Sequence, residues 1–207
     1  MSLPPILIAT TSVHKFTEIA AFLDGIPFQL KNLRDFPSIV PPDESGDSFE
    51  ANAIIKARAY EEYFGVACVA DDSGLVVDAL NGAPGIYSAR YAGEGATDQD
   101  NNAKLLAALE SVPANERTAR FVCCCALLIP GGEPGAAPHV ETGTVEGHIA
   151  FATSGAHGFG YDPLFIPNGH DKSFGELGAT IKSAISHRAQ AFKKLRAYLL
   201  QRKFEGA

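Results

Sequence analysis

Residues 66–80 read VACVADDSGLVVDAL, and the sheet of this protein can be inferred outward from them. The small or apolar residues Val66 to Ala70 predict a short buried strand, because strands covered on both faces are continuously apolar. Two adjacent acids, Asp71 and Asp72, follow, so we expect both at the end of that strand, where open sheets place their ligands. The alternative is that DDSG forms only a turn, with Asp and Gly chosen for backbone geometry.

The first half of the chain alternates strands with amphipathic helices. Apolar residues on one helical face, followed by a glycine, predict helices over residues 12–25 and 47–65. Asp47, with Glu50 three residues later, has the pattern of a capping box at the start of the second helix. The other elements expected here are strands at residues 6–9 and 26–33 and a Pro-rich loop at 36–46.

The second half combines two helices with a β-hairpin. Thr97, with Asp100 three residues later, is expected to cap a helix over residues 97–112, and Ser186 opens a C-terminal helix. The expected strands span residues 118–130, 139–150 and 164–166. A Gly- and Pro-rich segment joins the first two strands, as is typical of a hairpin. Crossover helices and a hairpin together predict a mixed sheet in an α/β fold.

Composition limits the class of protein. Of 207 residues 46% are hydrophobic, which is enough for one good-sized core, so we expect a single domain over residues 1–207. A net charge of -7 disfavours a nucleic-acid or membrane surface, which requires clustered Lys and Arg. No run approaches the ~18 to 20 apolar residues of a membrane span, and the start lacks signal-peptide features. We therefore expect a soluble, cytoplasmic protein.

Three of the four cysteines are consecutive, Cys123 to Cys125. On a strand these side chains would alternate between faces and could not converge on one zinc ion. No CxxC spacing occurs in the sequence, so we expect the cysteines to act as small buried hydrophobic residues.

The segment ATTSVHK, residues 9–15, lies where the first expected strand passes into the first expected helix. It offers the hydroxyls of Thr10, Thr11 and Ser12, free backbone N–H groups and Lys15 in the first helical turn. Such a terminus favours anions, because the N–H groups and the helix dipole both point at the ligand. The segment is therefore a candidate phosphate site. The alternative is that Ser12 is only an N-cap and Lys15 a solvated side chain.

The neighbouring carboxylates of Asp71 and Asp72 repel each other unless a cation neutralises them or one is protonated. Mg²⁺ suits such a pair, because it binds through one or two carboxylates and completes its shell with water and substrate phosphates. Glu44, in the loop before the second helix, can supply another oxygen. We therefore predict a magnesium site at the two aspartates.

Two later segments carry groups suited to a nucleobase. GFGYDP, residues 158–163, places two aromatics and Asp162 among glycines, so that a ring can stack on a base while a polar group pairs with its edge. Lys182 precedes the C-terminal helix, whose first turn holds His187 and Arg188. Cations at a helix N-terminus oppose the helix dipole, and such conflicts are expected at functional sites. The alternative is a surface basic patch with His187 in a cap network.

Five segments, taken in order, resemble the inosine/xanthosine triphosphate pyrophosphatases: ATTSVHKFTEI, DESGDSFEANAIIKARA, ADDSGLVVDALNGAPGIYSARYAG, SGAHGFGYDPLFIP and SFGELGATIKSAISHRAQAF. The resemblance extends over nearly the whole chain. It implies hydrolysis of deaminated purine nucleoside triphosphates such as ITP, dITP and XTP to the monophosphate and pyrophosphate. It also implies a magnesium-dependent homodimer and an elongated mixed sheet flanked by helices, with two lobes around a central cleft.

The resemblance further implies roles for single residues. Asp72 would be the general base and, with Glu44, a magnesium ligand, and Ser73 would contact the substrate. The residues implied for triphosphate binding are Thr10, Thr11, Ser12, Val13, His14 and Lys15. The residues implied for base binding are Phe159, Gly160, Tyr161, Asp162, Lys182, His187 and Arg188.

The expected reaction is attack on the α-phosphorus by water that Asp72 activates, with pyrophosphate as the leaving group. Base selectivity should rest on the 6-position, because hydrogen-bond donors of the site can donate to the 6-keto oxygen of hypoxanthine and xanthine, whereas adenine presents an amine, itself a donor, there. Three alternatives stay open. They are a related pyrophosphatase for pyrimidine or modified nucleotides, a non-catalytic nucleotide-binding module, and a phosphomonoesterase that would release orthophosphate.

Overall fold

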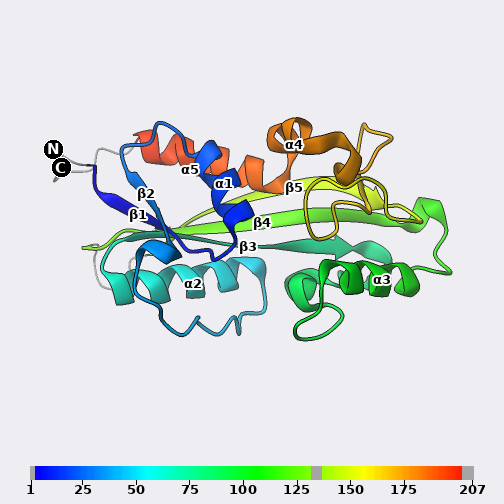
Figure 1. Ribbon diagram of the computed structural model, residues 1–207, viewed down its shortest axis with the longest axis horizontal. Coiled ribbons are helices and arrows are strands. Elements are labelled where there is room, and N and C mark those ends of the chain that lie inside the picture. The colour runs from blue at the N-terminus through cyan, green and yellow to red at the C-terminus, as the bar shows by residue number, and fades with distance from the viewer. Residues whose placement is uncertain (1–2, 132–136, 202–207) are drawn as a thin grey trace. The chain divides into compact units, whose positions relative to one another are not determined.

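The computed structural model describes residues 3–131 and 137–201, and within them it contains five α-helices and one six-stranded sheet (Figure 1). The strands are β1 (Pro5–Ile8), β2 (Gln29–Asn32), β3 (Ala67–Val77), β4 (Thr118–Leu128), β5 (His139–Ile149) and β6 (Phe165–Pro167). The helices are α1 (Val13–Phe22), α2 (Phe49–Phe64), α3 (Asp98–Ala108), α4 (Phe174–Ile185) and α5 (His187–Gln201). The strand order is β2-β1-β3-β4-β5-β6.

The sheet is mixed, as predicted. β1 pairs in parallel with both β2 and β3, as expected for strands linked through α1 and α2. β5 pairs with β6 in the antiparallel direction. The predicted α/β class, a mixed sheet flanked by helices, is therefore confirmed.

The described residues form two compact units. The first unit contains residues 3–72, 123–131, 137–143 and 188–201, and the second contains 73–122 and 144–187. A single domain over residues 1–207 and a central cleft between lobes stay predictions.

The first unit has three layers, with α1 and α5 on one face of its strands and α2 on the other (Figure 1). Successive side chains of each strand point to opposite faces of the sheet, and apolar residues on both faces allow helices to cover both. Ile6 and Ile8 of β1 contact the α1 and α5 layer, whereas Leu7 packs with Tyr60 of α2. The cysteines follow the same rule: Cys123 and Cys125 are in the cluster with α1 and α5. The four cysteines are free and buried, so their predicted packing role is confirmed.

The second unit has its own core, formed by β3, β4, α3, α4 and the segment around β6. Leu75, Leu105, Phe165 and Phe174 are completely buried in it. Arg117 is also buried there, and its guanidinium donates hydrogen bonds to three backbone carbonyls, which satisfies a charged group that would otherwise be costly to bury.

β3 is longer than predicted. It runs from Ala67 to Val77, so Asp71 and Asp72 lie in its middle and not at its end. The prediction of a strand end at the acids was wrong, and so was the alternative of a DDSG turn. The strand continues because each carboxylate meets a cation on the helix layer that it faces, so neither acid needs solvent.

Two helix starts also differ from the sequence prediction. Ser48 caps α2 by accepting a hydrogen bond from the Ala51 N–H at 3.1 Å, so the capping box proposed for Asp47 was wrong by one residue. α4 was not predicted, because glycines interrupt its apolar pattern and Gly178 has a non-helical φ of 76°. The signal for its start was Ser173 with Glu176, which do form a capping box.

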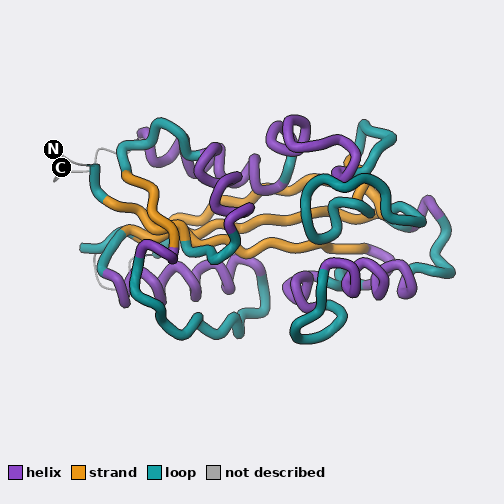
Figure 2. The backbone as a smooth tube through the Cα atoms, viewed as in Figure 1, coloured by secondary structure: helices purple, strands orange, loops and turns teal. Residues whose placement is uncertain are grey.

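The remaining elements agree with the predictions to within a few residues. Ser12 caps α1, Thr97 forms the expected capping box at α3, and α5 begins directly after Ser186. Residues 36–48 form a loop before α2 (Figure 2). β4 and β5 are sheet neighbours, as a hairpin requires, and part of the predicted turn, residues 132–136, lies outside the described residues.

Candidate active site

Asp71 and Asp72 lie on opposite faces of β3, since successive side chains of a strand point in opposite directions. The carboxylate of Asp71 lies 3.5 Å from Nη2 of Arg188, in the first turn of α5. Asp72 accepts a hydrogen bond at 3.2 Å from Nδ2 of Asn52, in α2. Both carboxylates are buried. The two adjacent acids therefore belong to two different polar networks.

The ammonium of Lys56, from α2, lies at the centre of the Asp72 network. Its Nζ is 3.4 Å from Oδ1 of Asp72 and 3.2 Å from Oε2 of Glu44. Asn52 and Lys56 are four residues apart in α2, so they share one helical face. The loop that carries Glu44 is tied to this face, because the Gly46 N–H donates to Oδ1 of Asn52 at 2.8 Å. The two acids predicted to hold magnesium are thus directed at one cationic atom.

The charges of this network depend on one another. Burial raises the pKa of Asp72, whereas the attraction of Lys56 and the Asn52 hydrogen bond favour its ionised form. Burial also disfavours the ammonium of Lys56, but the attraction of Asp72, Asp71 and Glu44 outweighs that effect and raises the pKa of Lys56. The pKa of Asp72 is raised overall, because its burial outweighs the Lys56 charge and the Asn52 hydrogen bond.

The sequence analysis did not identify Lys56 or Asn52. A positional signal existed, because each directly precedes an apolar residue of the buried helix face, Ala53 or Ala57. Polar groups at the border of a buried helix face lie close to the strand that the helix covers. Because the acids are on that strand, this pattern indicates that Asn52 and Lys56 lie close to them.

The predicted phosphate segment is the N-terminus of α1. Oγ of Ser12 accepts a hydrogen bond from the Lys15 N–H at 3.3 Å, and Oγ1 of Thr10 accepts one from the Ser12 N–H at 3.2 Å. Ser12 is thus the N-cap that the alternative interpretation described. Thr11, Val13 and His14 are exposed, whereas Lys15 is half-buried. Binding of a triphosphate by this segment stays a prediction.

Arg188 is almost completely buried, with 2% of its surface exposed. Its Nη1 donates to Glu18 of α1 at 2.9 Å, and its Nη2 faces Asp71. Burial disfavours its charge, but Asp71 and Glu18 outweigh that effect and raise the pKa of Arg188. Asp71 therefore neutralises a buried arginine, a partner that the sequence analysis did not assign to it.

In the second unit, Phe159, Asp162 and Lys182 come together. Nζ of Lys182 lies 2.6 Å from Oδ2 of Asp162 and 4.3 Å from the centre of the Phe159 ring. The same carboxylate oxygen accepts a hydrogen bond from the Phe159 N–H at 2.9 Å. Asp162 and Lys182 are both buried. The predicted base-binding segment thus combines an aromatic ring, a carboxylate and an ammonium, and Lys182 extends from the last turn of α4.

The other predicted residues of this unit differ in accessibility. Tyr161 is 4% exposed, and its hydroxyl donates to the backbone oxygen of Ser88 at 2.8 Å, so its ring belongs to the core. His187 is buried and stacks on the Phe121 ring, with centroids 4.8 Å apart. Ser73, directly after Asp72 on β3, is half-buried. Among the two aromatics of GFGYDP, Phe159 is therefore the one with an accessible face.

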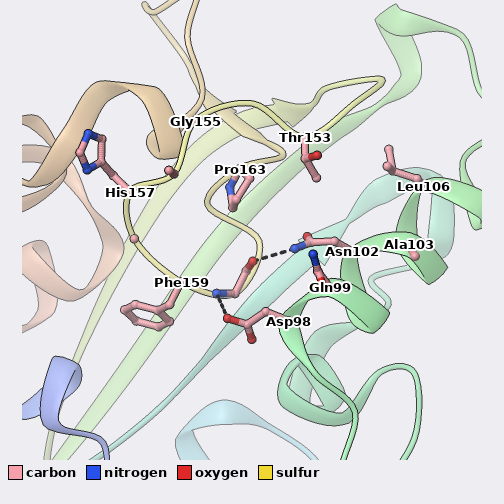
Figure 3. A pocket seen from close by; sticks show the side chains of 13 residues that line it. Asp98, Gln99, Asn102, Ala103, Leu106, Thr153, Gly155, His157, Phe159 and Pro163 are labelled. Atoms are coloured by element: carbon pink, nitrogen blue, oxygen red, sulfur yellow. Dashed lines mark hydrogen bonds between the residues drawn. The ribbon is translucent and has the colours of Figure 1, made fainter.

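A cavity of about 470 Å³ lies between α3 and the loop that leads into this segment (Figure 3). Asp98, Asn102 and Leu106 line it from α3, and Thr153 and His157 line it from the loop. The two dashed lines in Figure 3 mark the hydrogen bonds that the side chains of Asp98 and Asn102 form with the backbone of Gly160, Asp98 as acceptor and Asn102 as donor.

Within residues 3–131 and 137–201, no three His, Cys, Asp or Glu side chains gather to hold a metal ion by themselves. Magnesium does not need such a cluster, because one or two carboxylates are sufficient. In the same part of the chain, no helix has the length and apolarity needed to cross a bilayer.

Known proteins are similar to this chain in sequence and in fold. The family model described as the Ham1 family matches residues 6–198. The chain belongs to the Ham1 family. A relative from Geobacter sulfurreducens, named dITP/XTP pyrophosphatase, is 48% identical over 194 residues, which cover 94% of this chain and 96% of the relative. The dITP/XTP pyrophosphatase of Exiguobacterium sibiricum is 46% identical with the same coverage.

Solved Ham1 structures have the same fold. The HAM1 protein of Coxiella burnetii superposes with a TM-score of 0.87 at 39% identity, covering 96% of this chain and all of its own. A nucleoside-triphosphatase, dITP/XTP pyrophosphatase, of Mycobacterium abscessus gives a TM-score of 0.73 at 43% identity, covering 87% of this chain and 91% of that one. The family resemblance inferred from the five motifs is therefore confirmed.

Proposed function

We propose that this Ham1 protein hydrolyses the triphosphates of deaminated purine nucleosides, namely ITP, dITP and XTP, to the monophosphate and pyrophosphate. The supporting observation is the ionic cluster of Asp72, Lys56 and Glu44, in a chain that is 48% identical to a dITP/XTP pyrophosphatase. A buried carboxylate whose pKa is raised by burial and that lies beside an ammonium suits a general base in the hydrolysis of an acid anhydride.

The N-terminus of α1 is proposed to bind the triphosphate. Its free N–H groups and dipole favour negative charge, and Lys15 adds a positive charge in the first turn. The hydroxyl of Ser12 caps the helix, so we expect the phosphate contacts of this segment to come from the exposed turn around Thr11 and Val13.

Magnesium is the proposed cofactor, and the donor set fits it. Asp72 and Glu44 supply hard carboxylate oxygens, and both already face one positive charge, the ammonium of Lys56. These two residues would hold the ion, with water and phosphate oxygens completing its shell. When bound, the ion would stabilise the negative charge that develops on the departing pyrophosphate.

The proposed chemical step uses Asp72 as general base. Its carboxylate accepts a proton from water while the water oxygen forms a bond to the α-phosphorus. The bond between that phosphorus and the bridging oxygen breaks, and pyrophosphate leaves. Lys15 and the α1 terminus stabilise charge on the phosphates, since catalysis of such reactions is mostly positioning and electrostatics.

Base selectivity is proposed to depend on the 6-position of the purine. Phe159 would stack on the ring, and donors from Lys182, His187 and Arg188 would pair with the 6-keto oxygen of hypoxanthine or xanthine. Adenine presents an amine there, which leaves those donors unpaired, and unpaired buried donors reduce binding strongly.

We further propose that the protein is a cytoplasmic homodimer that binds neither nucleic acid nor membranes. The net charge of -7 supports the last point, and the homodimer follows the family resemblance. Light scattering coupled to size-exclusion chromatography tests the dimer, which a monomeric mass at micromolar concentration would contradict.

The decisive experiment is incubation with ITP and Mg²⁺, with pyrophosphate and orthophosphate assayed separately. We expect one pyrophosphate per ITP consumed and little orthophosphate. Orthophosphate as the first product would indicate a phosphomonoesterase. A nucleotide panel tests the base assignment, because faster turnover of dTTP or UTP than of ITP would indicate the pyrimidine-type alternative. Binding of ITP without turnover would indicate a non-catalytic module.

A further inference from the structure

Gly160, in the proposed base-binding segment, is held through both of its backbone polar groups by one face of α3. Its N–H donates to Oδ2 of Asp98 at 2.7 Å, and its carbonyl oxygen accepts from Nδ2 of Asn102 at 2.9 Å (Figure 3). Asp98 and Asn102 are four residues apart, so they project from the same side of the helix. One acceptor and one donor thus fix both the position and the orientation of this peptide segment.

Packing alone does not hold this segment. Residues 151–158 are exposed, and the cavity of about 470 Å³ lies between them and α3. Gly155, Gly158 and Gly160 all have positive φ, so the loop follows a path that depends on glycine and has few side chains to anchor it. Its early part is tied by hydrogen bonds from the Ser154 N–H to Pro163 and from the His157 N–H to Gly175 of α4, and at Gly160 it is tied to α3 across the edge of the cavity.

Gly160 lies inside the group of residues that we propose to bind the base. Phe159 precedes it, and Asp162, two residues later, binds both the Phe159 N–H and the ammonium of Lys182. Lys182 also lies over the Phe159 ring. A displacement of Gly160 would move the Phe159 ring relative to the Asp162 carboxylate and the Lys182 ammonium. Discrimination between bases depends strongly on the distances among such groups.

Asn102 is an unusual residue for its position. It is 6% exposed, and its Oδ1 has no hydrogen-bond partner within the described part of the chain. A buried amide with one unsatisfied oxygen is less favourable for stability than an apolar residue of similar shape. Among residues 3–131 and 137–201, the hydrogen bond that Nδ2 donates to Gly160 is the interaction that explains an amide at this position.

We propose that Asp98 and Asn102 are positioning residues that determine base selectivity by fixing Gly160. This inference rests on the proposed function. The substrate class concerned is the purine nucleoside triphosphates, and the discrimination that depends on the two residues is that between ITP and GTP, which share the 6-keto group and differ in the 2-amino group.

Asp98→Ala tests the acceptor, and Asp98→Asn is its matched control. Both variants remove the negative charge, but an asparagine oxygen can still accept from the Gly160 N–H. We expect Asp98→Ala to raise KM for ITP and to reduce the ITP-to-GTP ratio of kcat/KM about tenfold, with kcat changed much less. Asp98→Asn should restore the ratio to within about twofold of the wild type.

Asn102→Ala tests the donor, and Gln99→Ala is the control, because Gln99 lines the same cavity from the same helix. We expect the Asn102 variant to show the same change in the ratio and the Gln99 variant to keep the wild-type ratio. A loss of thermal stability in the Asp98 and Asn102 alanine variants without any change in selectivity would overturn the proposal.

Amide hydrogen exchange of residues 158–162 provides a measurement that does not need activity. Asp98→Ala and Asn102→Ala should exchange faster in this segment, whereas Asp98→Asn and Gln99→Ala should not. Unchanged exchange in both alanine variants would overturn the fixing of Gly160. Lack of pyrophosphate release by the wild type would instead contradict the proposed function. Base selectivity would then be measured as the affinities for IMP and GMP by calorimetry. Unchanged affinities in both alanine variants would overturn the role of Asp98 and Asn102 in selectivity.

Discussion

At the scale of single residues, the adjacent aspartates are explained by the alternation of a strand. Asp71 faces the layer with α5 and neutralises Arg188, whereas Asp72 faces α2 and its cation, Lys56. The mutual repulsion that suggested a metal is thus already reduced by one arginine charge and one lysine charge, on opposite sides of the sheet. We therefore expect Asp71 to stabilise the fold, and Asp72 stays the proposed general base.

Replacing each acid with its amide should separate these roles. For Asp72→Asn we expect turnover of ITP to fall about 10³-fold, because general-base catalysis is lost, while the protein stays folded. For Asp71→Asn we expect the free energy of unfolding to fall by about 3 kcal/mol, because Arg188 loses one of its buried partners. Pyrophosphate release and urea denaturation measure the two effects.

The outcome that contradicts this assignment is specific to each variant. Near-normal rates in Asp72→Asn would remove Asp72 from its proposed role. Unchanged stability in Asp71→Asn, together with a large loss of turnover below its melting temperature, would show that the roles of the two acids had been exchanged.

At the scale of elements, helix and strand formation was largely predictable, because caps and apolar periodicity are local. Ser12 and Thr97 cap their helices as expected, and β4 and β5 match the predicted strands. α4 was missed because its helical path is interrupted at Gly178, so no continuous periodic face marked it. The position of α4 is important for the candidate site, because this helix places Lys182 next to Asp162.

The contact between the glycine-rich loop and α4 gives a prediction at this scale. A Cβ on Gly155 would overlap the backbone of Gly175 and Glu176, and Gly155 also has a φ of +82°. Gly169 has nearly the same φ, +83°, but open space around its Cα. We expect Gly155→Ala to lower the free energy of unfolding by about 2 kcal/mol more than Gly169→Ala, because only the first variant forces atoms together.

Urea denaturation of both variants measures this difference. Since the strain from positive φ is nearly common to the two sites, the difference isolates the close approach of the backbones. Equal losses in the two variants would show that the loop moves away from α4 without penalty.

At the scale of the whole molecule, the four cysteines report on the packing of the sheet. Cys68, Cys123, Cys124 and Cys125 are all buried on β3 and β4. Burial raises the pKa of the thiols of Cys68, Cys123 and Cys125, so the reactive thiolate is scarce at neutral pH.

We therefore expect almost no reaction of the native protein with Ellman's reagent within minutes, and reaction of four thiols after denaturation in guanidinium. Raising the pH to 9 should increase the native rate only slightly, because the raised pKa values keep these thiols protonated. A rapid, stoichiometric reaction without unfolding would show that this part of the sheet opens.

The sequence by itself determined the family, the α/β class and most helices and strands, because motifs, caps and apolar periods are properties of neighbouring residues. It also identified Asp72, Glu44 and Lys182 as candidates. Only the tertiary structure decided which charge meets which. Lys56 reaches Asp72, Arg188 reaches Asp71, and Asn102 reaches Gly160 across separations of 16, 117 and 58 residues. Such pairs depend on which helix covers which face of a strand, and that choice is made by packing of the whole core.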